Sequence, residues 1–438
     1  MKITRKDFLT LSGVGALSAC TASDGKISDS AIPVKGLPSK LPRASIEQLH
    51  STHLSAYQLR MLSFSGLNIV NGKREGARIQ DAYTDKWYWD CHRLGSTYSV
   101  GHRNKRVIAA LRSAIEEIEI GNLMFLSQYR AVTASKLAAT TDGALPGVVF
   151  TATGSEANEA AIKAARRFTQ RKQIVCFEGA YHGATLMTMA VSGDDKRIDL
   201  YGLDEFDTIR IPFNDLERAK AAITSNTAAL IAEPTVSQLG FVEPQEGYWA
   251  ALSAHCEAVG ALIILDEVQT GGGATGSFWH YQQLNFTPDI LVSGKWPSGG
   301  YFPNAFALMR KEIHDEYTKD VLLPHPTTFG GSELGCLVTS EVIDILSDPE
   351  LLQRVQSLSE RFADGFSSLP ISLNRNGLCM AIIDDRRSSL ETMRLLLKAG
   401  VLVVPATHNP NAVEFRPILT ISDTEADEII QAVVAALA

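Results

Sequence analysis

Short apolar runs alternate with helical patterns through the middle of the chain, from Gly147 onward. Such alternation is typical of βαβ units, whose strands form a mainly parallel sheet with helices on its faces. We therefore expect an α/β fold with a large central domain. The runs that predict its strands are Val148–Thr151, Ile174–Phe177, Ala228–Ala232, Ala261–Leu265 and Ile290–Ser293.

The two flanks of this section carry a different pattern. A hairpin is predicted at Asp81–Asp90, with its turn at residues 84–86, and Lys105–Ile120 has helical periodicity. Near the C-terminus the pattern indicates a small α+β domain built from both ends of the chain. Its expected elements are strands at Leu378–Ile383, Val401–Val404 and Val413–Leu419 and helices at Ser388–Lys398 and Thr424–Leu437.

Five segments follow from these patterns. The expected boundaries are residues 1–20 for a signal peptide, 21–45 for a linker, 46–100 for the N-terminal part of the small domain, 101–325 for the large domain and 326–438 for the C-terminal part of the small domain.

The first twenty residues resemble a bacterial export signal. Basic residues precede Leu11–Ala19, a weakly apolar run that is too short to span a bilayer. Residues 17–20 (LSAC) are similar to a lipoprotein cleavage box, which makes Cys20 the expected lipidated residue, and residues 4–9 (TRKDFL) resemble a twin-arginine signal with a lysine in the second basic place. We expect an exported, membrane-anchored lipoprotein. The alternative is a basic tail on a cytoplasmic protein.

Composition excludes several classes of protein. The 438 residues include 41 basic and 49 acidic side chains, which give a formal charge of −8 and argue against a nucleic-acid-binding surface. Hydrophobic residues make up 45% of the chain, so it is not a disordered or collagen-like protein. The six cysteines lack C-x-x-C spacing, so neither a disulfide framework nor a metal site is indicated.

Polar or glycine-rich segments follow the predicted strands directly. In open α/β sheets, ligands bind beyond the carboxyl ends of the strands, so we expect these segments to converge on one site. The converging set is Gly154-Ser155-Glu156, Tyr181-His182-Gly183, Glu233-Pro234, Asp266-Glu267 and Lys295.

Two of these segments have the chemistry of a cofactor site. Gly154 and Ser155 begin a predicted helix, whose unpaired N–H groups and positive dipole end favour a phosphate, although a plain strand-to-helix turn explains them equally well. Tyr181 could lay its ring on a planar cofactor and His182 could orient that cofactor. A core tyrosine and a turn histidine are the alternatives.

Two charged residues complete the set. Asp266 closes a very apolar run, so its carboxylate needs a cationic or hydrogen-bonding partner, and a structural ion pair is the alternative. Lys295 follows a strand, where a partly desolvated amine can form a Schiff base with an aldehyde, although most such lysines are solvated. Together, a phosphate site, a stacking ring, a carboxylate for a pyridinium nitrogen and a Schiff-base lysine are what pyridoxal 5′-phosphate (PLP) requires.

From about residue 67 to the C-terminus, the chain resembles the class III, fold-type I PLP-dependent aminotransferases, a family that includes glutamate-1-semialdehyde aminomutase. The ordered series of motifs makes this resemblance specific. The motifs are TATGSEANEAAIKAAR (151–166), GAYHG (179–183), AEP (232–234), LIILDEVQTG (262–271), PDILVSGK (288–295), TTFGG (327–331) and FRPILTIS (415–422).

The resemblance implies a role for each matching residue. Lys295 would form the internal aldimine and move the proton, Asp266 would pair with the pyridine nitrogen, and the residues described above would hold the phosphate and stack on the ring. Gln269 would contact the O3′ of the cofactor, and Thr328 would reach the phosphate of the neighbouring subunit. A homodimer is therefore expected.

Four departures from the family pattern concern the substrate. Ala184 stands where ornithine-type members carry an arginine for the α-carboxylate, and Trp296 places a bulky ring after the lysine. Gln238 replaces a glutamate that in the family switches with the arginine corresponding to Arg416, and Ala274 replaces a further arginine. With Arg416 left without its partner, we expect ω-amino acids or primary amines to be better donors than ornithine-type α-amino acids.

The expected function is transfer of an amino group from an amine or ω-amino acid to a small keto acid through a Lys295 aldimine. One alternative is a 2,1-aminomutase of the glutamate-1-semialdehyde type, and another is a non-catalytic lipoprotein that keeps the fold. The expected partners are these small molecules and a second copy of the chain, with no nucleic acid and with a membrane only through the lipid anchor.

Overall fold

The computed structural model describes residues 41–193, 195–203 and 206–438. The predicted signal peptide with Cys20 and most of the predicted linker lie outside the described residues. Residues 41–56 belong to a unit of their own, with helix α2 (Arg43–His50) followed by a π-helical turn, Ser51–Ser55. No helix among the described residues is long and apolar enough to cross a membrane. Residues 57–438 form the larger unit.

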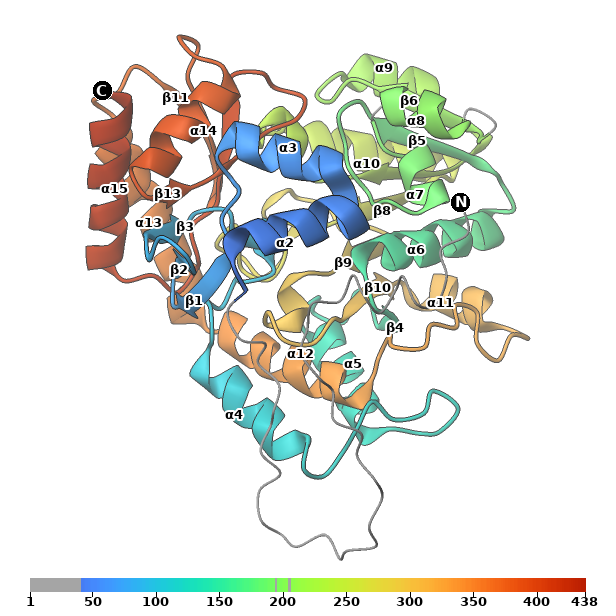
Figure 1. Cartoon of the computed structure of the whole chain (residues 1–438). Helices are drawn as coiled ribbons and strands as arrows, with labels where there is room; N and C mark the ends of the chain where they lie inside the picture. Colours follow the sequence, from blue (N-terminus) through green and yellow to red (C-terminus); the bar gives the residue numbers. More distant parts are fainter. Residues whose placement is uncertain (1–40, 194, 204–205) are drawn as a thin grey trace, which may run out of the picture. The chain divides into compact units, whose positions relative to one another are not determined.

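A seven-stranded sheet forms the centre of the larger unit, in the order β4-β10-β9-β8-β7-β5-β6 (Figure 1). Strand β10 runs antiparallel to both of its neighbours, and the other pairings are parallel. The five expected strands are confirmed, and β6 and β10 are additional. The bounds are β4 (Gly147–Thr151), β5 (Gln173–Phe177), β6 (Thr208–Ile211), β7 (Thr227–Ala232), β8 (Leu262–Asp266), β9 (Ile290–Ser293) and β10 (Ala305–Met309).

Helices cover both faces of this sheet, as a mainly parallel sheet requires. Successive strand residues point to opposite faces, so Ile264 packs in a cluster with the alanines of α6, whereas Ile263 packs with Leu252 of α10. Helix α12 packs against α4 and α5. The helix bounds are α4 (Lys105–Ala114), α5 (Gln128–Ala139), α6 (Gly154–Thr169), α7 (Leu186–Ala190), α8 (Asp195–Tyr201), α9 (Leu216–Ala222), α10 (Tyr248–Val259), α11 (Lys311–Thr318) and α12 (Glu333–Leu346).

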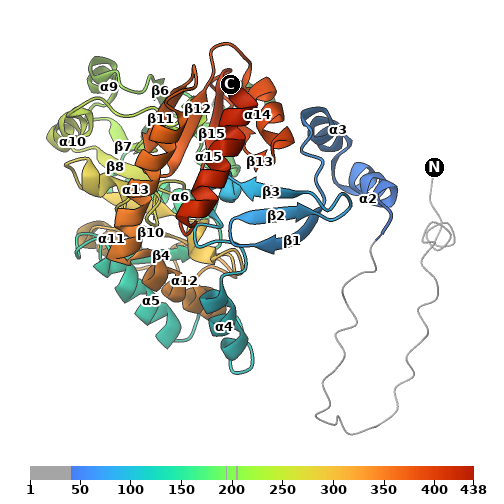
Figure 2. The same cartoon turned by 90° about the vertical axis from the view of Figure 1, so that its left-hand side faces the viewer.

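Two further sheets have four strands each; the first combines strands from both ends of the chain, and the second consists of C-terminal strands alone. Their orders are β1-β2-β3-β13 and β11-β12-β15-β14, and β13 pairs in parallel with β3 (Figure 2). The strand bounds are β1 (Asn71–Glu75), β2 (Arg78–Asp81), β3 (Trp87–Asp90), β11 (Ser372–Asn376), β12 (Cys379–Ile383), β13 (Val401–Leu402), β14 (Val404–Pro405) and β15 (Ala412–Phe415). The helix bounds are α3 (Ala56–Ser65), α13 (Pro349–Phe366), α14 (Ser389–Lys398) and α15 (Asp423–Leu437).

The predicted hairpin at Asp81–Asp90 is confirmed, because a turn joins β2 to β3 there. The helix predicted over residues 105–120 is too long, because α4 ends at Ala114. Glu116 and Glu117 follow that end, where the negative end of the helix dipole disfavours carboxylates.

Candidate active site

Asp266 lies buried at the carboxyl end of β8, with both carboxylate oxygens engaged. Its Oδ2 atom is 2.8 Å from His182 Nδ1 and accepts a hydrogen bond of 2.8 Å from Asn158 Nδ2. Its Oδ1 atom accepts a hydrogen bond from the backbone N–H of Val268 at 3.0 Å. The segments after β5 and β8 therefore do converge, and they meet around this carboxylate.

Asn158 is a site residue that the sequence analysis missed. It lies on α6, is 1% exposed, and also donates from Nδ2 to the carbonyl of His182 at 2.8 Å. One amide group therefore ties the helix to both Asp266 and the segment after β5. Only its position in the sequence could have indicated this role. Asn158 follows Gly154 by about one helical turn and therefore lies on the side of α6 that faces the sheet.

The backbone after β9 brings Lys295 to the start of α6. A Cβ built on Gly294 would lie 3.2 Å from the backbone nitrogen of Gly154. The backbone before Lys295 therefore packs directly against the start of α6, with little room for a side chain between them. Lys295 itself has a φ of +63°, an uncommon backbone conformation for a residue with a side chain. Strain of this kind is retained where the surrounding structure fixes the residue, and it is frequent at functional sites.

The amine of Lys295 is desolvated and lies near charges of both signs. A Cβ built on Gly95 would lie 3.1 Å from its Nζ atom, so the loop after β3 passes directly beside it. Burial and the nearby guanidinium of Arg416 lower the pKa of Lys295 to about 8, against the opposing effect of Asp266 and other carboxylates. A pKa of about 8 leaves about a tenth of the amine uncharged at pH 7, many times more than for an ordinary lysine.

The start of α6 has the features of a phosphate site. Thr153 caps the helix by accepting from the N–H of Glu156 at 3.2 Å, while the first N–H groups, those of Gly154 and Ser155, have no partner within the helix. The hydroxyl of Ser155 accepts a hydrogen bond from the backbone N–H of Ala184 at 3.2 Å, which places the segment after β5 beside this helix end. An anion here would meet backbone donors and the positive end of the dipole.

Tyr181 leaves its ring accessible, with 39% of the residue exposed. Its backbone N–H donates to Glu233 Oε1 at 3.1 Å, and the other oxygen of Glu233 accepts from the N–H of Ser237 at 3.3 Å. Burial raises the pKa of Glu233. Glu233 therefore fixes the backbone on which the aromatic ring stands.

These residues fit PLP by the chemistry of their donors and acceptors. The phosphate site, the accessible ring, the buried carboxylate and the lysine lie on adjoining loops at one edge of the sheet. The Nε2 atom of His182 is buried and has no hydrogen-bond partner among the described residues, and it belongs to the histidine that contacts Asp266. A polar atom left in this state is expected where a ligand completes the site.

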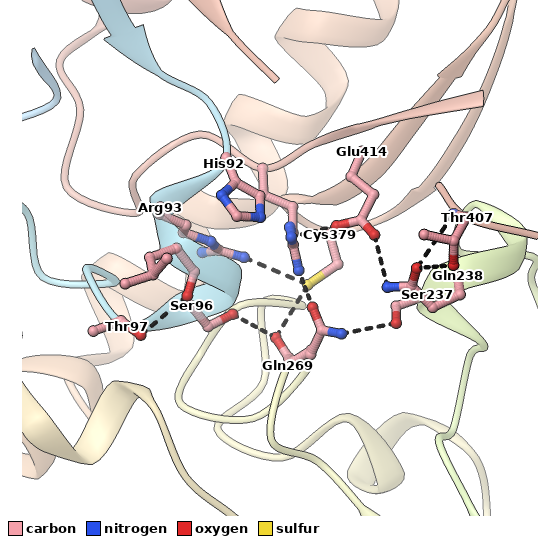
Figure 3. A network of polar contacts seen from close by, with 12 residues as sticks. His92, Arg93, Ser96, Thr97, Ser237, Gln238, Gln269, Cys379, Thr407 and Glu414 are labelled. Atoms are coloured by element: carbon pink, nitrogen blue, oxygen red, sulfur yellow. Dashed lines mark hydrogen bonds and ion pairs between the residues drawn. The ribbon is translucent and has the colours of Figure 1, made fainter. Parts of the chain in front are cut away.

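A polar network joins Gln269 to Arg416 and Glu414, and Figure 3 labels Gln269 and Glu414 in it. Gln269 donates from Nε2 to Ser237 Oγ at 2.8 Å and accepts a hydrogen bond from Arg416 Nη1. Arg416 also forms an ion pair with Glu414, and both side chains are almost fully buried. Gln238 donates from Nε2 to Glu414 Oε1 at 3.1 Å.

The expectation that Arg416 has no carboxylate partner is therefore wrong. Glu414 precedes it by two residues at the end of β15, and alternate residues of a strand point to the same face. Gln238 occupies the place expected for a carboxylate but orients Glu414 instead. Burial raises the pKa of Glu414, although Arg416 and Lys295 act in the opposite direction.

The loop after β3 adds two residues that the sequence analysis missed. Ser96 donates from Oγ to the carbonyl of Gln269 at 2.7 Å. Arg93 is fully buried and donates from Nη2 to the sulfur of Cys379 at 3.5 Å, and Figure 3 shows it pointing toward that residue. Burial lowers the pKa of Arg93 to about 10, and the positive charge of the neighbouring Arg416 contributes to this shift.

One predicted site residue, Trp296, lies elsewhere. The ring of Trp296 is fully buried in an aromatic cluster with Phe278, Trp279 and Phe306, and its Nε1 donates to Ser293 Oγ at 2.8 Å. It is a core residue and takes no part in the proposed substrate site. Thr328 is exposed at the surface of the single chain.

Comparisons with known proteins agree with this geometry. A sequence model of the family Aminotransferase class-III matches residues 64–437. An aminotransferase of Archaeoglobus fulgidus, described as uncharacterized, is 32% identical over 90% of this chain and 94% of its own length. The acetylornithine aminotransferase of Pseudomonas putida is 30% identical over 88% of this chain and 96% of its own length.

A solved structure shares the fold. The ornithine aminotransferase of Toxoplasma gondii ME49 superposes with a TM-score of 0.78 at 24% identity, over 91% of this chain and 98% of that one. The expected fold-type I architecture is therefore confirmed.

Proposed function

Because the chain belongs to the class-III aminotransferases, which are PLP-dependent enzymes, we propose that it transfers an amino group from a primary amine or ω-amino acid to a keto acid with Lys295 as its reactive amine. The relatives named as acetylornithine and ornithine aminotransferases support transamination over an aminomutase, and membership of an enzyme family supports a catalyst over a non-catalytic lipoprotein. The observation that carries the proposed choice of donor is the buried pair of Arg416 with Glu414.

When bound, PLP supplies an aldehyde that accepts the amino group and a ring that draws electrons from the donor carbon. Gly154 and Ser155 would bind its phosphate, Tyr181 would cover the ring, and Asp266 would keep a proton on the ring nitrogen. The Nζ atom of Lys295, with a pKa of about 8, can take up and release a proton near neutral pH.

The ion pair of Arg416 with Glu414 bears on which amine reacts. A guanidinium that already binds a carboxylate attracts the carboxylate of an α-amino acid less strongly, because the incoming group must displace Glu414. A donor that carries no carboxylate on the reacting carbon leaves the pair intact. A keto acid acceptor with its carboxylate at Arg416 must likewise displace Glu414, so the ion pair affects both half-reactions of an α-amino acid.

We expect the holoenzyme to convert ω-amino acids and primary amines about tenfold faster than matched α-amino acids, a difference typical of one altered contact in a pocket. The measurement is the loss of the cofactor absorbance in the first half-reaction, over a panel of donors of equal chain length. A clear preference for α-amino acids over ω-amino acids of equal chain length would contradict this choice of donor and leave the aminotransferase assignment standing.

Replacing Glu414 by glutamine should shift this preference toward α-amino acids by about tenfold in kcat/KM, because Arg416 loses its competing carboxylate. Gln238 can still hydrogen-bond the new amide oxygen, which limits the structural change. Glu360→Gln, an exposed change on α13, is the matched control and should leave the preference as it is. An unchanged preference in Glu414→Gln would show that the pair has a structural role.

We also propose that the active unit is a homodimer to which Thr328 contributes. Met124, Phe125 and Phe329 are 60%, 70% and 53% exposed. The guanidinium of Arg130 donates to the carbonyls of residues 122, 125 and 331. These hydrogen bonds connect the segment that carries Met124 and Phe125 to the segment that carries Thr328 and Phe329. Exposed apolar surface of this kind is typical of a protein–protein interface. A second copy of the same chain is the expected partner, because most soluble oligomers are homodimers with twofold symmetry.

Sedimentation should find a dimer, and the double variant Phe125→Asp/Phe329→Asp should dissociate it, because two charges would be buried in the interface. The control Leu200→Asp places the same charge on another exposed leucine and should leave the dimer intact. Thr328→Ala should keep the dimer but weaken PLP binding by about tenfold, the loss expected for one hydrogen bond to a charged group. A fully active wild-type monomer would rule the dimer out.

A further inference from the structure

A cavity of about 1000 Å³ lies beside the loop after β3. Its walls come from the β1–β2 hairpin, from residues 98–105 before and at the start of α4, and from the loop at residues 299–301. No residue assigned above to the candidate active site lines it.

Positive charge dominates this cavity. Lys73 and Arg74 come from β1, and Arg103 and Lys105 stand at the start of α4, whereas Glu75 is the acidic residue in the lining. None of the four cations forms an ion pair with another described residue. The whole chain carries a formal charge of −8, so a local excess of cations that lack partners is a specific feature of this surface.

The start of α4 adds to the attraction for anions. Asn104 caps the helix by accepting from the N–H groups of Arg106 at 3.0 Å and Val107 at 3.4 Å. The positive end of the dipole of this ten-residue helix therefore points toward the same cavity as Arg103 and Lys105.

Two polar groups in the lining lack partners. His102 is 4% exposed and has its Nε2 atom 2.8 Å from Asp90 Oδ2, while its Nδ1 atom has no hydrogen-bond partner among the described residues. The hydroxyl of Tyr301, a half-buried residue of the lining, also has no hydrogen-bond partner among the described residues. Because buried polar groups are normally paired, the unpartnered nitrogen of His102 in the wall of a cationic cavity supports a ligand site there.

The geometry points to a binding site for a small molecule that carries two or more phosphate groups. Arginine guanidinium groups and the N–H groups at a helix N-terminus both donate hydrogen bonds to phosphate oxygens. Four cations in one cavity attract a ligand with several negative charges more strongly than a ligand with a single charge. The volume suffices for a ligand of this size. The negative charge of the whole chain disfavours a long nucleic acid.

Calorimetric titration of the PLP-loaded full chain with pyrophosphate tests this site, with PLP filling the phosphate site at α6. We expect pyrophosphate to bind at least about tenfold more tightly than inorganic phosphate, and more weakly at higher salt. The double variant Lys73→Glu/Arg103→Glu should weaken pyrophosphate binding at least about tenfold, because two attractions become repulsions. The control Lys172→Glu makes the same charge change on an exposed residue outside the cavity.

The variants are compared only where their melting temperature and transamination rate match those of the wild type, since the cavity lies outside the active site. If the double variant unfolds, the single changes Lys73→Gln and Arg103→Gln should each weaken pyrophosphate binding measurably. Equal binding by wild type and the double variant would overturn the proposal. So would tighter binding of a single-stranded oligonucleotide than of pyrophosphate, or no pyrophosphate binding at low salt.

Discussion

Replacing Lys295 by arginine should lower kcat for transamination by about four orders of magnitude, the upper range for the loss of a positioned proton-transfer group. The amine is both the proposed attachment point of PLP and the group that moves the proton, and arginine stays charged at any working pH. Steady-state turnover with a good amine donor measures the loss. Lys163→Arg on α6, also a lysine with a pKa lowered by burial, is the matched control and should keep its activity.

A second readout separates attachment from catalysis. Borohydride reduction and peptide mapping of the wild type should place the pyridoxyl group on Lys295. Capture of PLP by the apoprotein should accelerate about tenfold per pH unit and level off above pH 8, because only the uncharged amine reacts and its pKa is about 8. A pyridoxyl group on another lysine, or capture that keeps accelerating to pH 10, would contradict the role of Lys295.

Asp266→Asn should retain PLP and yet lower the rate of proton removal from the donor by about 10² to 10³, the range found for the loss of one preorganised electrostatic contact. The amide has nearly the same shape as the carboxylate but carries no charge to hold a proton on the ring nitrogen. Single-turnover mixing of the holoenzyme with donor measures this step, and cofactor content is measured in parallel.

Asp289→Asn provides the control for stability. Asp289 is also a mostly buried carboxylate, which accepts from the N–H of Ile263 at 2.7 Å and pairs with Arg310 away from the active site. Its loss should lower the melting temperature without slowing proton removal. A normal half-reaction rate in Asp266→Asn would assign Asp266 a structural role.

Residues at strand ends were the predictable part of the site. Strands buried on both faces, such as β8 and β9, stand out as continuous apolar runs, and their carboxyl ends meet at one edge, so Asp266 and Lys295 follow from the pattern. Strand β6 (TIRI) was missed because it is short and carries a polar residue, Arg210, between isoleucines.

Partners brought together from distant elements were not predictable. Glu414 and Gln238 meet only when β15 reaches the loop after β7, and Arg93 reaches Cys379 across 286 positions. Trp296 was misplaced for a related reason: a ring beside Lys295 in sequence can point to either side of the sheet, and its neighbours Phe278 and Phe306 decide that it points into the core.

The parallel pairing of β13 with β3 has a consequence for biosynthesis. Val401 stands opposite Trp89, and the amine of Lys86 donates to the carbonyls of residues 397 and 398, so the hairpin near the N-terminus gains its partner strand only when translation is almost complete. Closing so long a loop costs conformational entropy and is a slow step. On the ribosome, the seven-stranded sheet can form with Asp266 and Lys295 in place while the hairpin edge stays unpaired. Chaperones that shield strand edges would therefore act on this chain during the interval before residue 401 emerges.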